Sequence, residues 1–260
     1  MLLCVVGNVA GVTQLHDVVY IVCFGSSTIR RFSATTHQRL TDINVQGLRD
    51  PRDIAACQRT SQLYVAGCPL LGTDECVWRV SSDAADIKRC LPKSPSDTFK
   101  PWTLSVTATR LLVTSYDNQL MQFDADGDEV RRVRLPDYMD PYHAVESPTG
   151  TFIVSHRNTP LKQYQVSEVN TEGRVLRHFS GSLGSFAPHI AVDSQGNIFA
   201  ADNDSRRILL LDAQLALRHV IIDEHQLNDK PRRLCYMEQS GQLLVGLDRG
   251  GVAVFDVLHR

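Results

Sequence analysis

The sequence has no excess of charge of either sign and no long apolar run. Its 27 Lys and Arg residues nearly balance 29 Asp and Glu residues, so the 260-residue chain carries a formal net charge of −2. This balance lacks the strong field by which a protein attracts nucleic acid or an anionic membrane. No apolar run approaches the roughly 18 residues of a membrane-spanning helix. The apolar start, MLLCVVGNVAGV, lacks the basic segment of a signal peptide. We therefore expect a globular protein without a membrane partner.

The short motifs that mark common catalytic and metal sites are also missing. The sequence contains no C-x-x-C pair, no phosphate-binding P-loop, no G-x-G-x-x-G and no G-x-S-x-G. The segment Asp124–Asp128 (DADGD) has some calcium-loop character, but no Glu stands at the twelfth position, so we expect a hairpin turn. These absences predict no cofactor, no bound metal and no catalytic residue set.

The cysteines give no sign of a disulfide framework. There are seven, so at least one thiol is unpaired. Most lie in predicted strands, where a cysteine is typically a small buried apolar residue, and this favours a reducing, cytoplasmic setting. Cys68 and Cys76 bracket a loop between two predicted strands and could face each other. Their disulfide state stays open, as does the oligomeric state of the chain.

What the sequence contains is one β unit, repeated. Its clearest copy is Pro188–Asp212, PHIAVDSQGNIFAADNDSRRILLLD, in which two alternating strands flank a Ser-Gln-Gly-Asn turn and a third strand follows. Other copies begin near Gly7, Pro51, Pro101, Pro141 and Pro231. A period of roughly 40–50 residues without a helical pattern is typical of four-stranded blades. The sequence therefore predicts an all-β fold, a six-bladed β-propeller that forms a single domain over residues 1–260.

The two ends of the chain are expected to complete one blade together. After Pro231 there is room for three strands only, whereas the strand Leu2–Val6 before Gly7 has no blade of its own. If this N-terminal strand closes the last blade, the ring exposes no long sheet edge. Deleting the first six residues should then destabilise the whole molecule.

The repeat resembles a known family pattern. The repeat is similar to the NHL repeat of tripartite-motif proteins and their relatives, through the pattern P-h-x-I-A-V-D-x-x-G-N-I-F-A-A-D-N-x-x-x-R-I-L-L-L-D. The copy at Pro188 matches the NHL repeat well, and the other copies match it in outline. In these relatives the propeller is usually a C-terminal module, which implies that this chain could belong to a larger multidomain protein. The resemblance specifies architecture more than function, because propellers host enzymes, receptors and scaffolds.

The residues that differ between copies predict a binding site around one mouth of the central channel. The position after each anchor holds Asn8, Arg52, Trp102, Tyr142, His189 and Arg232, a variety that a structural repeat does not need. Loops after the second strands reach the same rim. The candidate binding residues are Arg52, Trp102, Tyr116, Tyr142, His156, Arg157, His189 and Arg232. Because Trp, Tyr and Arg dominate binding hot spots, non-catalytic recognition of a protein or peptide is favoured.

RNA binding is the first alternative. Some NHL propellers that this chain resembles bind RNA on that face, and Arg52 and Arg232 with Trp102 and Tyr142 could contact phosphates and stack on bases. The predicted rim loops, however, carry about as many acidic as basic residues, Asp53 and Arg233 among them. RNA affinity rests largely on an unbalanced positive charge, so this alternative is disfavoured.

A metal-dependent lyase or hydrolase is the second alternative. Peptide-amidating lyases, which the chain resembles in its expected fold, hold zinc on histidines from successive inner strands in a Pro-His-x-hydrophobic setting. Only Pro188-His189-Ile190 matches this setting, and the corresponding residues in other copies are not usual zinc ligands. With this incomplete set, an enzyme is less favoured than a binding module.

Overall fold

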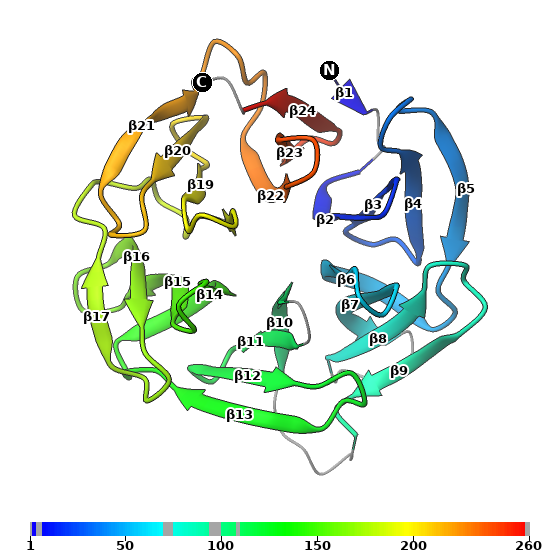
Figure 1. Cartoon of the computed structure of the whole chain (residues 1–260), viewed down its shortest axis with the longest axis horizontal. Coiled ribbons are helices and arrows are strands. Elements are labelled where there is room, and N and C mark those ends of the chain that lie inside the picture. Colours follow the sequence, from blue (N-terminus) through cyan, green and yellow to red (C-terminus); the bar gives the residue numbers. More distant parts are fainter. Residues whose placement is uncertain (1, 4–6, 70–74, 94–99, 108–109, 258–260) are drawn as a thin grey trace.

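The structure of this protein is a computed structural model that describes residues 2–3, 7–69, 75–93, 100–107 and 110–257. Within these ranges the chain forms β-strands and no helix. The strands build six four-stranded sheets, and the sheets surround a central axis as the blades of a propeller (Figure 1). The predicted all-β, six-bladed propeller is confirmed.

The first three blades follow one another along the chain, each from its innermost to its outermost strand. Blade one contains β2 (Val9–Leu15), β3 (Val18–Cys23), β4 (Thr28–Ser33) and β5 (Arg39–Asn44). Blade two contains β6 (Leu48–Cys57), β7 (Gln62–Pro69), β8 (Cys76–Ser81) and β9 (Ile87–Leu91). Blade three contains β10 (Pro101–Val106), β11 (Leu111–Ser115), β12 (Gln119–Phe123) and β13 (Glu129–Arg134).

The next three blades repeat this order, except that the outermost strand of the last blade comes from the N-terminus of the chain. Blade four contains β14 (Met139–Glu146), β15 (Phe152–Asn158), β16 (Gln163–Val169) and β17 (Val175–His178). Blade five contains β18 (Ile190–Val192), β19 (Ile198–Asp202), β20 (Arg207–Leu211) and β21 (Leu217–Ile222). Blade six contains β22 (Pro231–Met237), β23 (Gln242–Leu247), β24 (Val252–Asp256) and β1 (Leu2–Leu3).

The N-terminal strand closes the ring as expected. β1 pairs antiparallel with β24, with Leu2 opposite Ala253 and Leu3 opposite Val252. Residues 4–6 of the expected closing strand lie outside the described residues. Because the first and last strands of the chain share one sheet, unfolding of either end breaks the same blade.

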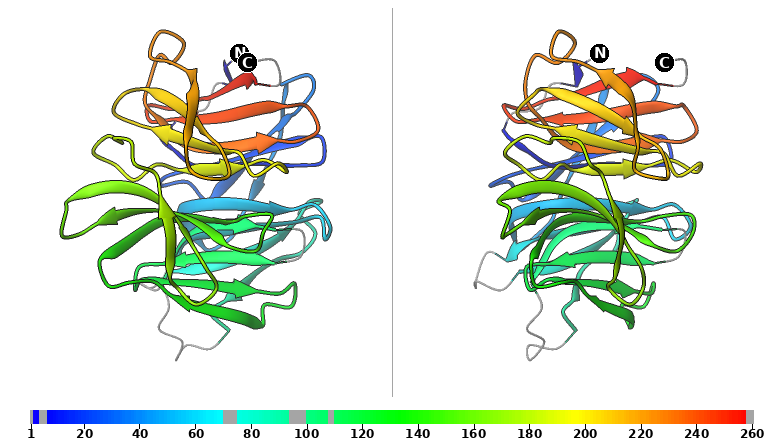
Figure 2. Two further views of the ribbon diagram at one scale, coloured as in Figure 1. Left: turned by 60° about the vertical axis from the view of Figure 1, so that its left-hand side comes forward. Right: turned by 90° about the vertical axis from the view of Figure 1, so that its left-hand side faces the viewer.

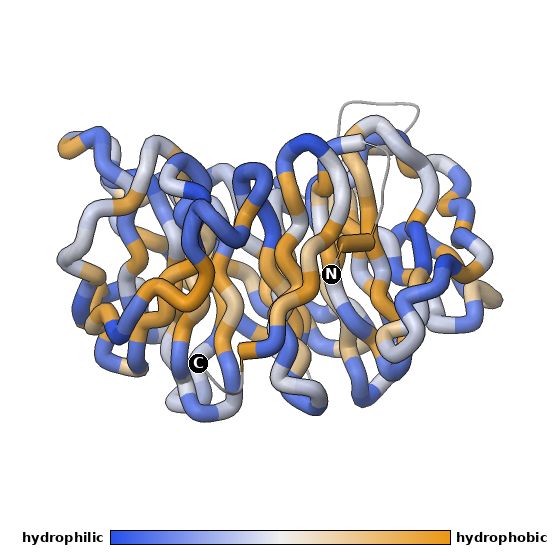
Figure 3. The backbone as a smooth tube through the Cα atoms, turned by 90° about the horizontal axis from the view of Figure 1, so that it is seen from above, coloured by the Kyte–Doolittle hydropathy of each residue, from blue (hydrophilic) through white to orange (hydrophobic). Residues whose placement is uncertain are grey.

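The apolar core lies between blades rather than inside one sheet. Each of six buried clusters joins two neighbouring blades, and the ring of clusters includes the pair formed by blades six and one. In Figure 2 the strands run between the two faces of the molecule. Figure 3 shows hydrophilic residues gathered in the turns at these faces and hydrophobic residues in the strands between them. A single blade therefore has no core of its own.

The loops divide into two sets, one on each face. We call "rim face" the face that carries the loops leading into the innermost strands and the loops joining second to third strands. It includes Arg52, Tyr116 and Tyr142. The turns between first and second strands lie on the opposite face, since consecutive strands in each blade are antiparallel.

A β-bulge near the start of five innermost strands determines which side chains face the channel. In blade two, Pro51 pairs with Gly67 and Asp53 with Ala66, so Arg52 is the additional residue. The same shift occurs at Ala10, Trp102, Tyr142 and Arg232. A bulge redirects its side chain away from the regular alternation, and it also tolerates a proline inside a strand.

Blade five lacks this bulge, and that corrects one expectation. Its short β18 pairs regularly, with Ile190 opposite Ala200, and the Ala201 N–H donates to the His189 carbonyl at 3.0 Å. His189 therefore corresponds to His143 and not to Tyr142, one position from the expected alignment. In blade one the bulged residue is Ala10 rather than Asn8.

Two local expectations concern turns and thiols. The Asp124 carboxylate accepts the N–H groups of Asp126 and Asp128, and Gly127 has a φ of 80°, so this segment is a hairpin turn as predicted. No disulfide joins any two of the six cysteines in the described ranges, so Cys68 and Cys76 do not bridge to each other. No helix among the described residues is long and apolar enough to cross a membrane.

Candidate functional site

The channel is lined at its centre by one residue from each blade, which lies in the innermost strand or, in blade five, directly before it. These six residues occupy the position directly after the bulge, or its equivalent in blade five: Gly11, Asp53, Thr103, His143, His189 and Arg233. Those with polar side chains are all buried. A structural repeat would not need a carboxylate, two imidazoles and a guanidinium at equivalent points, so this layer is the first part of the candidate site.

Arg233 crosses the channel and holds four blades together. It is 1% exposed. Its Nε donates to the Ala10 carbonyl, its Nη2 to the Arg52 carbonyl at 3.0 Å and its Nη1 to the Tyr142 phenolic oxygen at 2.7 Å. Its Nε lies 3.9 Å from Oδ1 of Asp53. The guanidinium is thus a buried cation whose donors are matched by acceptors from blades one, two and four.

Asp53 is the buried partner of this cation. Its two carboxylate oxygens accept the N–H groups of Ile54 and Leu104, both at 2.9 Å. Burial raises the pKa of Asp53, while Arg233 and these hydrogen bonds act in the opposite direction. Gly11 leaves room for this carboxylate, because a Cβ there would lie 2.6 Å from the Ile54 nitrogen and 2.9 Å from Oδ1 of Asp53.

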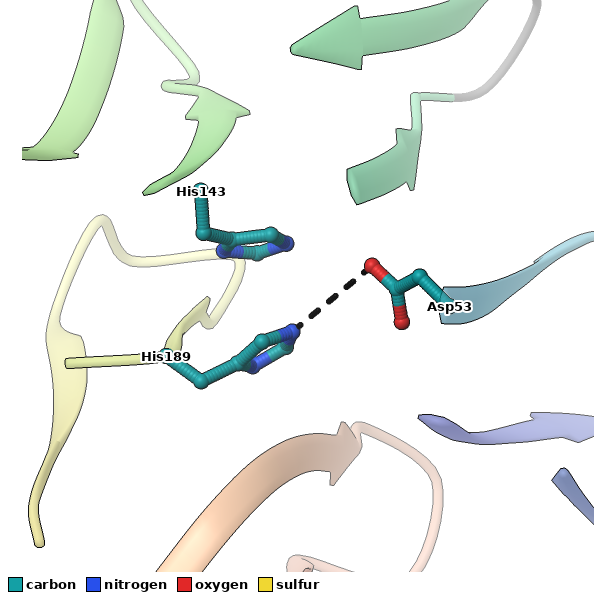
Figure 4. Close-up of side chains that lie close together, drawn as sticks. All are labelled: Asp53, His143 and His189. Atoms are coloured by element: carbon teal, nitrogen blue, oxygen red, sulfur yellow. Dashed lines mark ion pairs between the residues drawn. The ribbon is translucent and has the colours of Figure 1, made fainter. Parts of the chain in front are cut away.

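His143 and His189 stack beside the carboxylate. Their ring centroids lie 3.8 Å apart with planes 24° from parallel, and Figure 4 shows both rings directed toward Asp53. Nε2 of His189 is 4.0 Å from Oδ2 of Asp53 and has no hydrogen-bond partner. Burial holds the pKa of both imidazoles well below the usual histidine range, so both rings are neutral near pH 7.

Asp53, His143 and His189 have the donor atoms of a metal site but not its proton arrangement. One ligand atom from each lies within 4.8 Å of the others. However, Nδ1 of His189 accepts the Leu234 N–H at 3.2 Å, which puts the ring proton on Nε2. Nε2 of His143 lies 3.4 Å from the Leu104 carbonyl oxygen. Because a carbonyl can only accept, this Nε2 carries the ring proton and donates it. Both nitrogens that face Asp53 (Figure 4) thus carry protons.

Above this layer, four of the predicted residues form an aromatic and cationic cluster on the rim face. The Trp102 ring lies 4.5 Å from Tyr116 and 6.2 Å from Tyr142, centroid to centroid. The Arg52 guanidinium sits 5.1 Å from the Trp102 ring centre and pairs with Asp50 at 3.3 Å. We call Arg52, Trp102, Tyr116 and Tyr142 the rim cluster. Because Tyr142 also bonds to Arg233, the rim cluster is joined to the channel layer.

A pocket of about 250 Å³ opens beside the rim cluster, between blades five and six. Tyr142 and His189 line it from the channel side, and Phe186, Lys230, Arg232 and Asp248 line its outer walls. Arg232 pairs with Asp248 at 2.6 Å and lies over the Phe24 ring at 5.3 Å. Lys230 pairs with Asp204 at 3.0 Å. We call this hollow the rim pocket.

The remaining predicted residues are not part of this group. His156 is buried, its Nε2 bonds to the Ser167 hydroxyl at 2.9 Å, and burial lowers its pKa to about 4. It lines a separate pocket with Tyr138 and His178. Arg157 is exposed. The structure thus brings Arg52, Trp102, Tyr116, Tyr142, His189 and Arg232 near the channel mouth and leaves His156 and Arg157 apart.

Two charged residues of the channel layer were expected elsewhere. The sequence suggested that Asp53 and Arg233 belong to the solvent-exposed charges of the rim loops, but they are 2% and 1% exposed. The available signal was their position two residues after Pro51 and Pro231, where the other copies have Thr103 and His143. An alternation that allows for the bulge would have placed them in the channel.

The opposite mouth of the channel is wider and different in character. A pocket of about 690 Å³ there is lined by the turns of blades three to six, with Glu146, Asp193, Glu238 and Arg110 among its residues. Each acidic group already accepts hydrogen bonds from neighbours, for example Glu146 from Gln122 at 2.8 Å. None of the described residues that line this pocket is aromatic.

Similarity to known proteins lies in the fold. No protein-family model and no curated protein sequence matches the chain. Similar solved structures include the WD40 β-propeller domain of Doa1, at 17% identity and a TM-score of 0.66, with 98% of this chain and 95% of that chain covered. The structure of streptogramin B lyase is similar at 10% identity and a TM-score of 0.65, with 98% of this chain and 96% of that chain covered. A chain of a nidogen/laminin complex is similar at 14% identity and a TM-score of 0.66, with 87% of this chain and 84% of that chain covered. At these identities the likeness establishes the architecture alone: the chain is a β-propeller whose structural neighbours include a WD40 domain, a chain of a protein complex and a lyase.

Proposed function

We propose that this chain is an NHL-type propeller that recognises a protein or peptide on its rim face and carries out no catalysis there. The observation that carries the proposal is the rim cluster, in which Arg52, Trp102, Tyr116 and Tyr142 from blades two, three and four meet at the channel mouth. Trp, Tyr and Arg are the residue types that supply most of the binding energy at protein interfaces.

The rim cluster is held in place before any partner arrives. Tyr142 is fixed by the hydrogen bond from Arg233, and Trp102 lies between Arg52 and two tyrosine rings. Side chains that are already ordered lose little conformational entropy on binding, which favours affinity. Tyr116 keeps 43% of its surface exposed and Phe186, on the same face, 59%. The face therefore combines fixed anchors with apolar area that a partner can cover.

The ion pairs of the rim face favour a polypeptide over RNA. Arg52, Arg232, Lys230 and Arg249 each lie within 4.0 Å of a carboxylate, on Asp50, Asp248, Asp204 and Asp229. A paired cation contributes little to the net positive field on which RNA affinity depends. A mixed surface of charges and aromatic rings is instead the usual composition of a protein interface.

Selection from a random peptide library tests the proposal. The wild-type protein is used as bait, and the enriched peptides are measured by isothermal calorimetry against the wild type and against Trp102→Ala with Tyr142→Phe. We expect the double substitution to weaken binding by at least tenfold. Arg110→Ala, on the opposite face, is the control and should leave the affinity unchanged. Equal affinities for the wild type and the rim double variant would reject the proposed face.

Metal-dependent catalysis is a second candidate, favoured by one observation. Asp53, His143 and His189 bring three potential metal ligands within 4.8 Å in a buried layer, next to a pocket that His189 also lines. Against this candidate stand the protons on both Nε2 atoms and the cation Arg233, 3.9 Å from the carboxylate. Tight, stoichiometric Zn²⁺ binding that is lost on Asp53→Asn would favour it over the first candidate.

A further inference from the structure

We propose that the rim pocket binds a carboxylate group of the recognised peptide, with Arg232 as its principal cation. This inference rests on the proposed peptide recognition and adds the chemical class of the group that enters the pocket. The carboxylate can come from an Asp or Glu side chain or from the C-terminus of the partner. The same contacts would hold either one.

One residue that lines this pocket has a hydrogen-bond donor without an acceptor. The Tyr142 oxygen already accepts the N–H of Arg233 at 2.7 Å, so the phenolic proton is directed elsewhere, and no described residue accepts it. His189 also lines the pocket, but its Nε2 faces Asp53 at 4.0 Å. A donor such as the Tyr142 hydroxyl normally meets an acceptor. A ligand with oxygen lone pairs and no proton of its own supplies that acceptor.

The wall combines two cations with acidic partners, and the ion pairs leave several donors of the cations free. Arg232, Lys230 and Asp248 line the pocket, and Asp204 lies 3.0 Å from Lys230. The ion pair between Lys230 and Asp204 leaves two Lys230 protons free, and the contact between Nη1 of Arg232 and Asp248 leaves the other Arg232 nitrogens free among the described residues. A guanidinium has five donors in a planar fork and binds carboxylates in a bidentate manner.

The position of the pocket suits a peptide already bound to the rim cluster. Tyr142 belongs to both, since it packs 6.2 Å from Trp102 and lines the pocket. A peptide lying across the aromatic rings would therefore meet the pocket within one or two residues, because an extended chain advances about 3.3 Å per residue. Phe186, which is exposed, also lines the pocket and offers apolar surface beside the ion pair.

Asp248 makes the proposal testable in two directions. It occupies the same Arg232 nitrogen that an incoming carboxylate would use, so the two anions compete. Arg232→Gln should weaken binding of a carboxylate-bearing peptide, whereas Asp248→Asn should strengthen it. A purely structural role of this ion pair predicts instead that both substitutions act in the same direction.

The experiment uses the tightest-binding peptide selected from the library, together with its matched neutral forms. Each Asp or Glu is replaced by Asn or Gln in turn, and a further form carries an amidated C-terminus, so that the two sources of the carboxylate are distinguished. With the wild type, one of these forms should bind about tenfold more weakly. With Arg232→Gln the same change should alter Kd less than twofold, and with Asp248→Asn the charged peptide should gain several-fold.

Four results overturn the proposal, and they differ in what else they affect. If no neutral form binds more weakly, or if Arg232→Gln and Asp248→Asn shift Kd in the same direction, the pocket does not bind a carboxylate, yet recognition on the rim cluster stands. If no peptide is enriched, or if the substitution of Trp102 leaves the peptide affinity unchanged, the proposed function fails and this inference fails with it. Thermal unfolding of both variants checks that they are folded, and Asp248→Asn carries the test alone if Arg232→Gln is not.

Discussion

Nη1 of Arg233 donates to the phenolic oxygen of Tyr142 at 2.7 Å, across the channel and over a separation of 91 residues in the chain. Arg233 is buried in the channel layer, while Tyr142 is part of the rim cluster. A single hydrogen bond therefore connects the charge balance of the channel to the orientation of an aromatic residue on the rim face.

Replacing Arg233 should strongly destabilise the protein. Arg233→Met leaves the Asp53 carboxylate buried without its cation, and removing one partner of a buried pair typically costs about 3–5 kcal/mol. Urea denaturation monitored by fluorescence measures the loss. Arg232→Met is the matched control, since Arg232 pairs with Asp248 near the surface and should cost at most about 1 kcal/mol.

The double variant Asp53→Leu with Arg233→Met separates the charge from the packing. If the uncompensated carboxylate causes the loss, removing it should recover most of the stability that Arg233→Met alone removes. A double variant as unstable as Arg233→Met would mean that the hydrogen bonds of Arg233 to Ala10, Arg52 and Tyr142 matter more than its pairing with Asp53.

The stacked histidines should make the protein less stable in mild acid. Burial lowers the pKa of His143 and His189 in the folded state, whereas in the unfolded chain they titrate near 6.5. The unfolded state thus binds more protons, and stability is complete above pH ~6.5 and falls below it by up to about 1.4 kcal/mol per pH unit for each ring. Asp53, whose pKa is raised by burial, acts in the opposite sense.

Urea denaturation between pH 7.5 and 5 measures this slope. His189→Asn keeps an acceptor for the Leu234 N–H but cannot be protonated, so its stability should depend less steeply on pH than that of the wild type. Arg233 acts on both rings, and it stays charged throughout this range because its pKa is raised. The same slope in both proteins would show that His189 is not the titrating group.

The architecture could be predicted because the repeat is encoded locally. The strand–turn–strand pattern and the spacing of the anchors led to six blades, and the unpaired strand at Leu2 led to closure with β24, which Leu2 and Leu3 confirm. The register of the innermost strands was harder to predict. A bulge adds one residue without a sequence signature of its own, so His189 was aligned with Tyr142 although it corresponds to His143.

The rim cluster was predicted more completely than the channel layer for a physical reason. Trp102 and Tyr142 stand out as unusual residues in a repeat, whatever their exact orientation. The burial of Asp53 and Arg233 depends on a pairing between blades two and six, which no local pattern indicates. Single charged residues near strand ends are typical of surfaces. Asp53 and Arg233 are buried because closure of the ring brings their blades together.

Closure of the ring should depend on Leu3. Its side chain is 3% exposed and belongs to the core cluster between blades six and one. Leu3→Ala should therefore lower the free energy of unfolding by about 2–5 kcal/mol, as measured in urea. Leu2 is 52% exposed, and Leu2→Ala should change the same quantity by no more than about 0.5 kcal/mol. Equal effects would show that β1 does not contribute to the core.

Zinc should bind weakly if at all to the channel layer. A neutral imidazole coordinates a metal through the nitrogen that lacks a proton, and the hydrogen bonds of His143 and His189 put their protons on the atoms that face Asp53. Titration with Zn²⁺ at pH 7.5 should raise the melting temperature no more for the wild type than for His189→Asn. A larger, saturable rise in the wild type would instead support the catalytic candidate.

The most direct test of peptide recognition on the rim face uses the two tryptophans of the chain. Trp102 lies in the rim cluster, whereas Trp78 is 5% exposed in the core between blades one and two. In ¹⁵N NMR spectra recorded during titration with a selected peptide, the indole N–H resonance of Trp102 should shift with the Kd found by calorimetry, while that of Trp78 stays in place. Saturable peptide binding that leaves the Trp102 resonance unchanged would contradict recognition on this face.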